Sequence, residues 1–235
     1  EEAERAQKEG HGPSLSGEVE KRAAGSVVVN RYGERFCNET ADYDSTWRTY
    51  FSWENHGDLK QRNLPAFVIY DAKVRENATI AGRKVGEALP DWVVEKPSLD
   101  EVAEVFGIDA EQLALSVEEF NRQARQGRDP RFARGQSSYD RFGQDDPASV
   151  LAPVEKPPFF AAEIAVGDVG TCGGPRVDQH ARVLDPFGNP IQGLYASGNN
   201  AGVGSPGASY GGGGGTIGPA LTFAYVAGEQ LGRSG

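Results

Sequence analysis

Five consecutive glycines, residues 211–215, run directly into an apolar segment that begins at Thr216. A helix starting at Thr216 would leave its first backbone N–H groups without partners inside the helix, and the positive end of its dipole would point back into the glycines. Because glycine has no Cβ atom, a flat ring could lie directly against this backbone. The pattern therefore predicts a binding site for a ring with an electron-rich, partly anionic edge. A mobile loop before a helix is the alternative that the local sequence leaves open.

A neighbouring glycine pattern resembles a dinucleotide-binding motif but lacks its context. Residues 202–207 match G-x-G-x-x-G, and Glu229 follows where an acidic residue could contact a ribose. Pro206 and the glycine run, however, prevent a helix from opening at the third glycine, and Glu229 would lie on a terminal helix rather than at the end of a strand. A P-loop is excluded because no Lys-Ser or Lys-Thr pair follows any of the glycines.

The composition argues against several functional classes. The net charge is -10 and no basic run occurs, so nucleic-acid binding is not expected. No apolar run approaches the ~20 residues of a membrane span, and no signal-peptide pattern is seen, so the expected location is the cytoplasm. Cys37 and Cys172 are isolated and His11, His56 and His180 are scattered, which predicts no metal site.

The elements expected to position the glycine-rich site are short strands and three helices. Short strands are expected at 26–30, 34–36, 67–74, 161–166, 170–178 and 193–200, and within 181–191 on either side of a turn at 186–189. Helices are expected at 98–107, 109–127 and 216–231. Ser98 and Asp109 each provide an N-cap oxygen, and Glu101 and Gln112 follow at the capping-box spacing. Residues 38–63 show no clean periodicity, and 128–158 are expected to form loops.

Two regions of the chain resemble a known superfamily. The segments GTCGGPRVD, ARVLDPFGNPIQGLYASGN and SYGGGGGTIGPALTFAYVAG closely resemble the C-terminal signature of the FAD-dependent fumarate reductase and 3-ketosteroid dehydrogenase superfamily. VVNRYGERFCNETADY resembles the segment at the start of its substrate-capping domain. The likeness covers roughly residues 20–232. It implies an α+β fold, with residues 1–160 as the capping, catalytic domain and its flanking segment, and 161–235 as the C-terminal segment of an α/β FAD-binding domain.

The resemblance makes FAD the expected cofactor. It implies that the start of the last helix faces the pyrimidine edge of the flavin, where negative charge collects on reduction. The implied cofactor-binding residues are Gly170, Gly198, Asn199, Gly215, Thr216 and Ile217. The N-terminal glycine motif that holds the ADP half of FAD in this superfamily is absent from these residues, and the chain contains no methionine. We therefore expect a missing N-terminal half, in a longer precursor or a separate subunit, without which FAD would bind weakly.

Within the superfamily, the implied substrate site is neutral. Fumarate reductases carry an arginine at the position of Tyr43 and a second arginine near the position of Tyr210. They carry a histidine where this sequence has Val169 and Gly170. A dicarboxylate would be left unpaired at these positions, which is energetically costly.

The tyrosines instead resemble the pattern of the 3-ketosteroid Δ1-dehydrogenases, whose substrates are hydrophobic cyclic ketones. The resemblance implies that Tyr43 takes a proton from the carbon next to the ketone. Tyr210 and the backbone N–H of Gly214 would polarise the carbonyl, and flavin N5 would accept the hydride. Arg35 and Glu39 are expected to make structural contacts that pose the loop before Tyr43.

Three alternatives remain open from the sequence. Tyr43 lies in an aromatic-rich stretch and could be a packing residue. The chain could belong to an enoate reductase resembling the fumarate reductases. It could also be a catalytically inactive half or subunit of a split flavoprotein.

Overall fold

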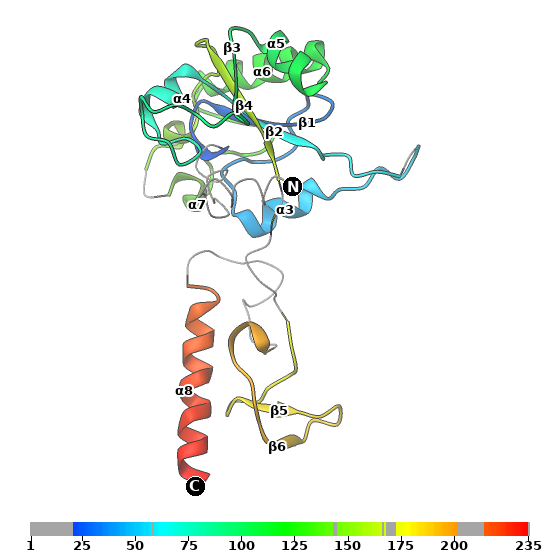
Figure 1. Cartoon of the computed structure of the whole chain (residues 1–235), viewed down its shortest axis with the longest axis vertical. Coiled ribbons are helices and arrows are strands. Elements are labelled where there is room, and N and C mark those ends of the chain that lie inside the picture. Colours follow the sequence, from blue (N-terminus) through cyan, green and yellow to red (C-terminus); the bar gives the residue numbers. More distant parts are fainter. Residues whose placement is uncertain are drawn as a thin grey trace. The chain divides into compact units, whose positions relative to one another are not determined.

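The computed structural model describes residues 21–57, 59–142, 145–165, 167, 173–201 and 214–234 (Figure 1). The chain divides into two compact units, residues 1–166 and 167–235, and each is described by itself. Unit 1 contains β1 (Ser26–Asn30), α3 (Tyr43–Tyr50), β2 (Ala66–Asp71), α4 (Ala72–Asn77), β3 (Val94–Lys96), α5 (Leu99–Phe106), α6 (Ala110–Ala124), α7 (Ser138–Arg141), η1 (Pro147–Val150) and β4 (Phe159–Ile164). Unit 2 contains β5 (Arg182–Leu184), β6 (Pro190–Tyr195), η2 (Gly198–Asn200) and α8 (Ile217–Ser234). The expected mixture of helices and strands is confirmed.

Unit 1 is built on an antiparallel sheet with strand order β1-β2-β4-β3. Val28 pairs with Val68 on β2, and Val68 pairs with Ala162 on β4. All residues of β1 and β2 are buried, because both faces of the sheet are covered. This explains why both strands are almost continuously apolar instead of alternating with polar residues.

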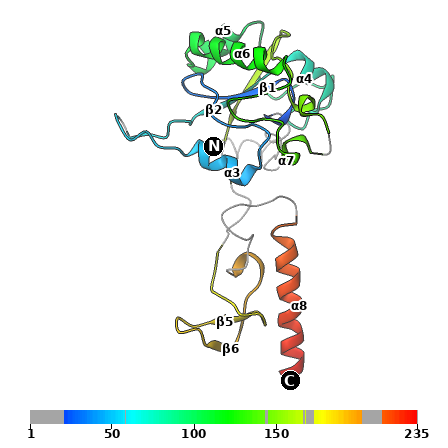
Figure 2. The same cartoon turned by 180° about the vertical axis from the view of Figure 1, so that it is seen from behind.

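Successive residues of β1 point into two different cores. Val27 and Val29 pack with the buried side chains of α5 and α6, whereas Val28 packs in the second core, which contains Tyr50 of α3. Figure 2 shows α5 and α6 on one side of the sheet and α3 on the other. The sheet thus separates two cores, and α3 packs in the core on the side opposite α5 and α6.

The helix caps predicted from the sequence are confirmed. The Ser98 side chain accepts a bond from the Glu101 N–H at the start of α5, and the Asp109 side chain accepts one from the Gln112 N–H at the start of α6. Gly107 ends α5 in the left-handed conformation with φ +64°, where glycine has no Cβ penalty. The starts of both helices and the end of α5 therefore follow from local chemistry.

The expectations for the first half of the chain differ from the structure in three places. The strand expected at 67–74 is β2 only as far as Asp71, and Ala72–Asn77 form the helix α4. Residues 34–36 do not form a strand, since Arg35 makes only an isolated bridge to Val29 among the pairings described. Within 38–63 the structure has α3, which the irregular sequence pattern did not reveal. Only Thr46 and Tyr50 of this helix are buried, so the stripe that faces the core is too short to produce a visible period.

The segment between α3 and β2 projects from unit 1 as a narrow arm (Figure 1). Trp53 and Gln61 form an antiparallel bridge across it. Near its base, the Tyr32 hydroxyl donates to Glu54 at 2.9 Å and Arg62 donates to Glu54 at 3.2 Å. The arm is therefore held at its base by polar contacts.

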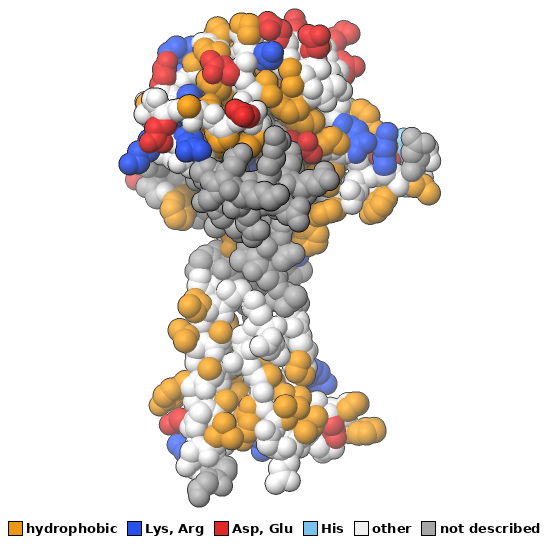
Figure 3. Space-filling model, in the orientation of Figure 1, with side chains coloured by type: hydrophobic (Ala, Val, Ile, Leu, Met, Phe, Trp, Pro, Cys, Tyr) orange, Lys and Arg blue, Asp and Glu red, His pale blue; other side chains and the backbone are white. Residues whose placement is uncertain are grey.

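Unit 2 consists of the β5–β6 hairpin, the short η2 turn and the long helix α8. The hairpin turn is organised by Asp185, whose carboxylate accepts from the N–H groups of Phe187 and Asn189 at 2.9 and 2.8 Å. Leu221 and Tyr225 of α8 are about two-thirds exposed, at 65% and 69%. Figure 3 shows hydrophobic side chains exposed along α8 and over the hairpin. An apolar surface of this extent is typical of a surface that another part of a protein covers.

None of the helices in the described ranges combines the length and the hydropathy of a membrane-crossing segment. The same ranges contain no group of three or more acidic, histidine or cysteine side chains arranged to hold a metal ion.

Candidate active site

Tyr43 is the first residue of α3. Asp42 caps this helix, because its side chain accepts a bond from the Ser45 N–H at 2.9 Å and its carbonyl accepts one from the Thr46 hydroxyl at 2.6 Å. These two bonds stabilise the first turn of α3. The position of Tyr43 is therefore set by the cap and not only by the packing of its ring.

Tyr43 lies at the border between the buried and the exposed sides of α3. At helical spacing it falls between Tyr50, which is buried, and Trp47, which is 42% exposed. The Trp47 ring makes an edge contact with Phe51 at a centroid distance of 5.8 Å. The half-buried Tyr43 is thus flanked on its outer side by aromatic surface, which suits an apolar ring ligand.

The segment before Tyr43 is anchored by a buried carboxylate. Glu39 is fully buried and accepts two bonds from Arg35, Nε to Oε1 and Nη2 to Oε2, both at 2.8 Å. Arg134 donates to the same carboxylate at 3.2 Å, and the Val28 N–H donates to it from β1 at 3.2 Å. Glu39 therefore ties the segment to the central sheet. The predicted structural role of Arg35 and Glu39 agrees with these contacts.

A second carboxylate balances the charge of this cluster. Arg35 also donates to Asp129 at 2.9 Å, and its guanidinium lies 4.5 Å from the centroid of the Phe120 ring. Arg134 donates to the carbonyls of Ser26 and Ala23 at 2.8 and 2.6 Å. Two buried cations thus meet two buried anions, and both terminal nitrogens of Arg134 also reach backbone oxygens, whereas its buried Nε has no hydrogen-bond partner among the described residues.

The electrostatics follow from burial and from these partners. Burial alone would raise the pKa of Glu39, but the Arg35 and Arg134 guanidiniums lower this pKa to about 2. Burial also lowers the pKa of Arg134. Burial raises the pKa of the Cys37 thiol, and Glu39 adds to the rise, so Cys37 is a neutral core residue and not a nucleophile.

Four charged residues that the sequence did not reveal bind the segment 35–41: Arg22, Asp129, Arg134 and Asp140. Each is a charged residue in a mostly polar stretch of the sequence. No local pattern distinguishes such a residue from one on the solvated surface, so no signal in a single sequence could have found them.

The predicted residues of the glycine-rich site lie in unit 2. Gly214 has φ +93°, and a Cβ atom built on it would meet nothing within 4 Å. Its carbonyl accepts from the Gly218 N–H at 2.9 Å, and the Thr216 carbonyl accepts from the Ala220 N–H at 3.1 Å. The N–H groups of Gly215, Thr216 and Ile217 precede the first intrahelical bonds and so have no acceptor within α8.

Gly198 and Asn199 occupy the η2 turn, close to α8. Gly198 has φ +60°, and a Cβ atom there would lie 2.9 Å from the Ala220 Cβ. A Cβ on Gly174 would lie 2.8 Å from the Asn200 carbonyl carbon. Glycine at both positions therefore allows η2 to pack closely against its neighbours, whereas Asn199 is exposed.

Tyr210 and Gly170 lie outside the described residues, so their predicted roles stay predictions. Tyr43 belongs to unit 1, and Gly214 to Ile217 belong to unit 2.

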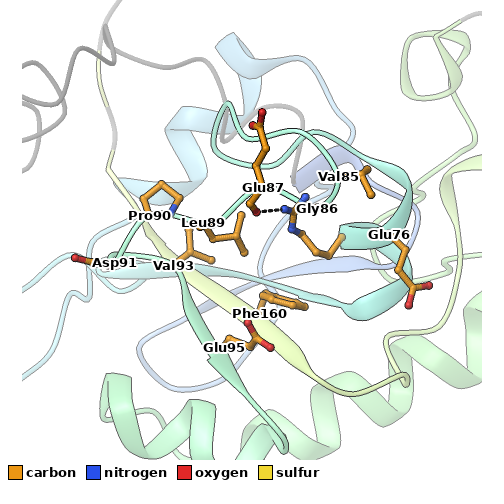
Figure 4. Close-up of a pocket in the computed structure, with 12 residues that line it drawn as sticks. Glu76, Val85, Gly86, Glu87, Leu89, Pro90, Asp91, Val93, Glu95 and Phe160 are labelled. Carbon is orange, nitrogen blue, oxygen red and sulfur yellow. Dashed lines mark hydrogen bonds between the residues drawn. The ribbon is translucent and has the colours of Figure 1, made fainter.

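A pocket of about 570 Å³ lies in unit 1 (Figure 4). Its lining includes the apolar side chains of Phe160 and Val93 and the acidic side chains of Glu87, Asp91 and Glu95. Arg75 also lines this pocket, and its guanidinium donates to the Glu87 carbonyl. None of the predicted catalytic or cofactor-binding residues lines it.

Comparisons with known proteins identify relatives. The FAD binding domain family matches residues 11–216. The chain is 40% identical over 216 residues to the 4-oxocyclohexanecarboxylate 2-dehydrogenase of Sinomonas cyclohexanicum, covering 90% of this chain and 37% of that protein. It is 40% identical over 220 residues to the 3-oxosteroid 1-dehydrogenase of Mycolicibacterium smegmatis (strain ATCC 700084 / mc(2)155), covering 88% of this chain and 38% of that protein.

A solved structure agrees with these relatives. The 3-ketosteroid delta1-dehydrogenase of Sterolibacterium denitrificans, in complex with 1,4-androstadiene-3,17-dione, matches with a TM-score of 0.81 and 36% identity, covering 92% of this chain and 40% of that one. The resemblance to the superfamily of fumarate reductases and 3-ketosteroid dehydrogenases is confirmed. The chain spans less than half the length of each of the three proteins described.

Proposed function

The chain belongs to the FAD binding domain family, and from this premise we propose that it is part of an FAD-dependent dehydrogenase that introduces a carbon–carbon double bond next to a ring ketone. The observation that carries the proposal is its 40% identity to two dehydrogenases that are named for different oxo-substituted rings, one a cyclohexane and the other a steroid. The feature common to both names is a ketone on a saturated or partly saturated ring. The proposed substrate is therefore a hydrophobic cyclic ketone.

The two parts of the chain have different proposed roles. Residues 1–160 form the substrate-capping domain and carry Tyr43, and residues 161–235 contribute the last segment of the FAD-binding domain. A further FAD-binding part, in the same polypeptide or in a partner subunit, completes the cofactor site. The exposed apolar side chains of α8, among them Leu221 and Tyr225, support this arrangement because they offer a surface for that part to cover.

The residues of unit 2 fit an FAD flavin at the start of α8. Gly214 leaves open space beside its backbone, and the first-turn N–H groups point toward the N-terminal end of the helix. The N–H groups of Gly215, Thr216 and Ile217 would hold the electron-rich edge of the ring. Gly198 and Asn199 would lie near the ribityl or ribose part, and Gly170 against the ring. FAD, when bound, supplies the acceptor for a hydride.

The residues of the chain divide the remaining chemistry among themselves. Tyr210 and the Gly214 N–H donate to the ketone oxygen and so acidify the hydrogen on the adjacent carbon. Tyr43, held by the Asp42 cap, takes that proton. The aromatic surface of Trp47, one helical turn beyond Tyr43, excludes water from the ring substrate.

Reduction of the bound flavin by substrate tests this function. Anaerobic addition of a 3-ketosteroid, or of 4-oxocyclohexanecarboxylate, to the FAD-loaded protein should bleach the flavin absorbance. Succinate should not, because Tyr43 and Tyr210 offer no positive charge to a dicarboxylate. Bleaching by succinate alone would contradict the ring-ketone proposal, and failure of every compound to bleach the flavin would contradict dehydrogenase activity.

A further inference from the structure

Arg22 joins two segments of unit 1 that are far apart in the sequence. Its Nη1 donates to the carbonyls of Thr40 and Ala41, at 2.6 and 3.5 Å. Its Nη2 donates to the carbonyls of Tyr139 and Asp140, at 3.0 and 3.3 Å. The guanidinium also lies 5.2 Å from the centroid of the Tyr139 ring. One side chain thus connects residues 40–41, which lead into α3, to residues 139–140 of α7.

The same two segments are joined a second time by Asp140. Its Oδ2 accepts from Asn38 Nδ2 at 3.1 Å and from the Gly135 N–H at 3.0 Å, and the residue is 3% exposed. Asn38 in turn accepts from the Thr40 N–H at 3.0 Å. Residues 38–41 lead into α3. Asp140 binds the start of this segment at Asn38, whereas Arg22 binds its end at Thr40 and Ala41.

We propose that Arg22 is a positioning residue for Tyr43. The proposal rests on the role given to Tyr43 in the proposed function. The Ala41 carbonyl that Arg22 contacts lies immediately before Asp42, and Asp42 is the cap that fixes the first turn of α3. A shift of the 40–41 backbone therefore moves the cap, and the cap moves Tyr43. An error of about 1 Å in the placement of a reacting group can cost up to ~10²-fold in rate.

An arginine suits this role better than a lysine. The two terminal nitrogens of Arg22 serve one segment each, and the planar guanidinium holds them in a fixed relation. A lysine ammonium is a single donor centre on a flexible stem, so it could serve one segment well but not fix the distance between both. The charge itself is secondary, because all four acceptors are neutral backbone oxygens.

Steady-state kinetics of the FAD-loaded protein give the first test. Arg22→Ala should lower kcat by roughly 10- to 100-fold with KM for the ring ketone nearly unchanged. The kcat of Arg22→Lys should lie between those of the wild type and Arg22→Ala. Arg131→Ala is the matched control, because Arg131 pairs with Glu119 on the exposed surface of unit 1 at 3.3 Å, and it should keep wild-type kinetics. An unchanged kcat in Arg22→Ala overturns the proposal.

A double-mutant cycle separates positioning from a general loss of structure. In a Tyr43→Phe background there is no phenol left to position, so Arg22→Ala should cause little additional loss of kcat. If the two losses multiply in full, Arg22 acts independently of Tyr43 and the proposal is wrong. If Arg22→Ala does not fold, the same cycle with Arg22→Lys decides the question.

A spectroscopic measurement tests Arg22 without reference to catalysis. With 3-fluorotyrosine at position 43, the ¹⁹F resonance should be shifted from that of the free amino acid. It should move back toward the free position, or broaden, in Arg22→Lys and Arg22→Ala, but not in Arg131→Ala. An unchanged resonance overturns the positioning role. Full turnover by Tyr43→Phe would instead overturn the proposed role of Tyr43, while the fluorine shift still reports whether Arg22 holds that residue.

Discussion

Arg35 and Glu39 are four residues apart in the sequence and form a buried ion pair with two hydrogen bonds. Their side chains are 3% and 0% exposed, and Arg134 contacts the same carboxylate. The pair lies just before the residues that lead into α3, whose first residue is Tyr43. Loss of the pair should therefore lower the stability of unit 1 and change the position of Tyr43.

Glu39→Gln should strongly destabilise unit 1. The substitution leaves Arg35 and Arg134 with one buried carboxylate, Asp129, in place of two, and an uncompensated buried charge typically costs about 3–5 kcal/mol. All three tryptophans of the chain, Trp47, Trp53 and Trp92, are in unit 1. Urea unfolding followed by tryptophan fluorescence therefore reports on this unit.

The control for Glu39→Gln is Arg131→Ala, which removes an exposed ion pair with Glu119. Exposed pairs contribute about 0–1 kcal/mol, so this variant should unfold at nearly the wild-type urea concentration. Equal unfolding midpoints for the two variants would show that the buried cluster adds nothing to stability.

The stability of unit 1 should fall in acid between about pH 4.5 and pH 2. In the folded state the pKa of Glu39 is lowered from 4.5 to about 2, so its stabilising contribution is complete above the unfolded pKa and disappears as the pH falls through the folded pKa. Unfolding free energies measured by urea titration from pH 6 to pH 2 should show this slope. Glu39→Gln should flatten it, and an identical slope in that variant would assign the acid sensitivity to other carboxylates.

The elements predicted correctly are those that a local pattern in the sequence signals. β1 contains three consecutive valines, Val27 to Val29, and Ser98 and Asp109 cap helices whose start they signal in the sequence. α3 escaped prediction because only Thr46 and Tyr50 of its residues are buried. Its helical state depends on the core that these two side chains join, which is a property of the folded unit.

The candidate site divides in the same way. Tyr43 was identified because a motif places it, and Gly214 to Ile217 because glycines before a helix have a direct physical meaning. Arg22 and Arg134 could not be identified, since their partners are backbone carbonyls and a carboxylate that only the folded chain brings near them. A single charged residue carries no mark in the sequence of the burial that gives it a role.

Tyr43→Phe should abolish most turnover without unfolding the protein. The change removes one hydroxyl from a half-buried ring, so folding and FAD content should be retained, and loss of a general base should lower kcat by roughly 10²–10⁴-fold. Tyr32→Phe is the control, because it removes a hydroxyl that donates to Glu54 near the base of the projecting arm. It should keep its kcat. Near-normal turnover in Tyr43→Phe would make Tyr43 a packing residue.

Trp47→Ala should weaken substrate binding more than turnover. Trp47 is 42% exposed and lies one turn beyond Tyr43 on α3, so it is placed to cover a ring whose ketone side meets Tyr43. Loss of that aromatic contact should raise KM for a ring ketone about 10-fold with a smaller effect on kcat. Trp53→Ala removes a more exposed indole, at 66%, from the arm, and KM should then be unchanged. Equal effects of the two substitutions would remove Trp47 from the substrate surface.

Alanine substitutions at three glycines of unit 2 distinguish the effect of close packing from the effect of ligand access to the backbone. Gly188, Gly198 and Gly214 all have positive φ, at +89°, +60° and +93°, so alanine at each position should cost about 1–2 kcal/mol through backbone strain alone. At Gly198 the new Cβ would also lie 2.9 Å from the Ala220 Cβ, which adds about 1–3 kcal/mol of overpacking. Gly198→Ala should therefore lose the most hydrogen-exchange protection in α8.

Gly214→Ala should act on ligands more than on stability. A Cβ at Gly188 or Gly214 would meet nothing within 4 Å, so both alanine variants carry the same backbone strain and no clash. Gly188 lies in the β5–β6 turn, whereas Gly214 lies at the start of α8, where the proposed flavin and ketone approach the backbone. Gly214→Ala should thus weaken FAD retention or raise KM for the ring ketone about 10-fold or more, while Gly188→Ala should change neither. FAD release followed by flavin fluorescence, together with KM, measures both effects. Identical values for the two variants would reduce Gly214 to a turn residue and remove it from the site.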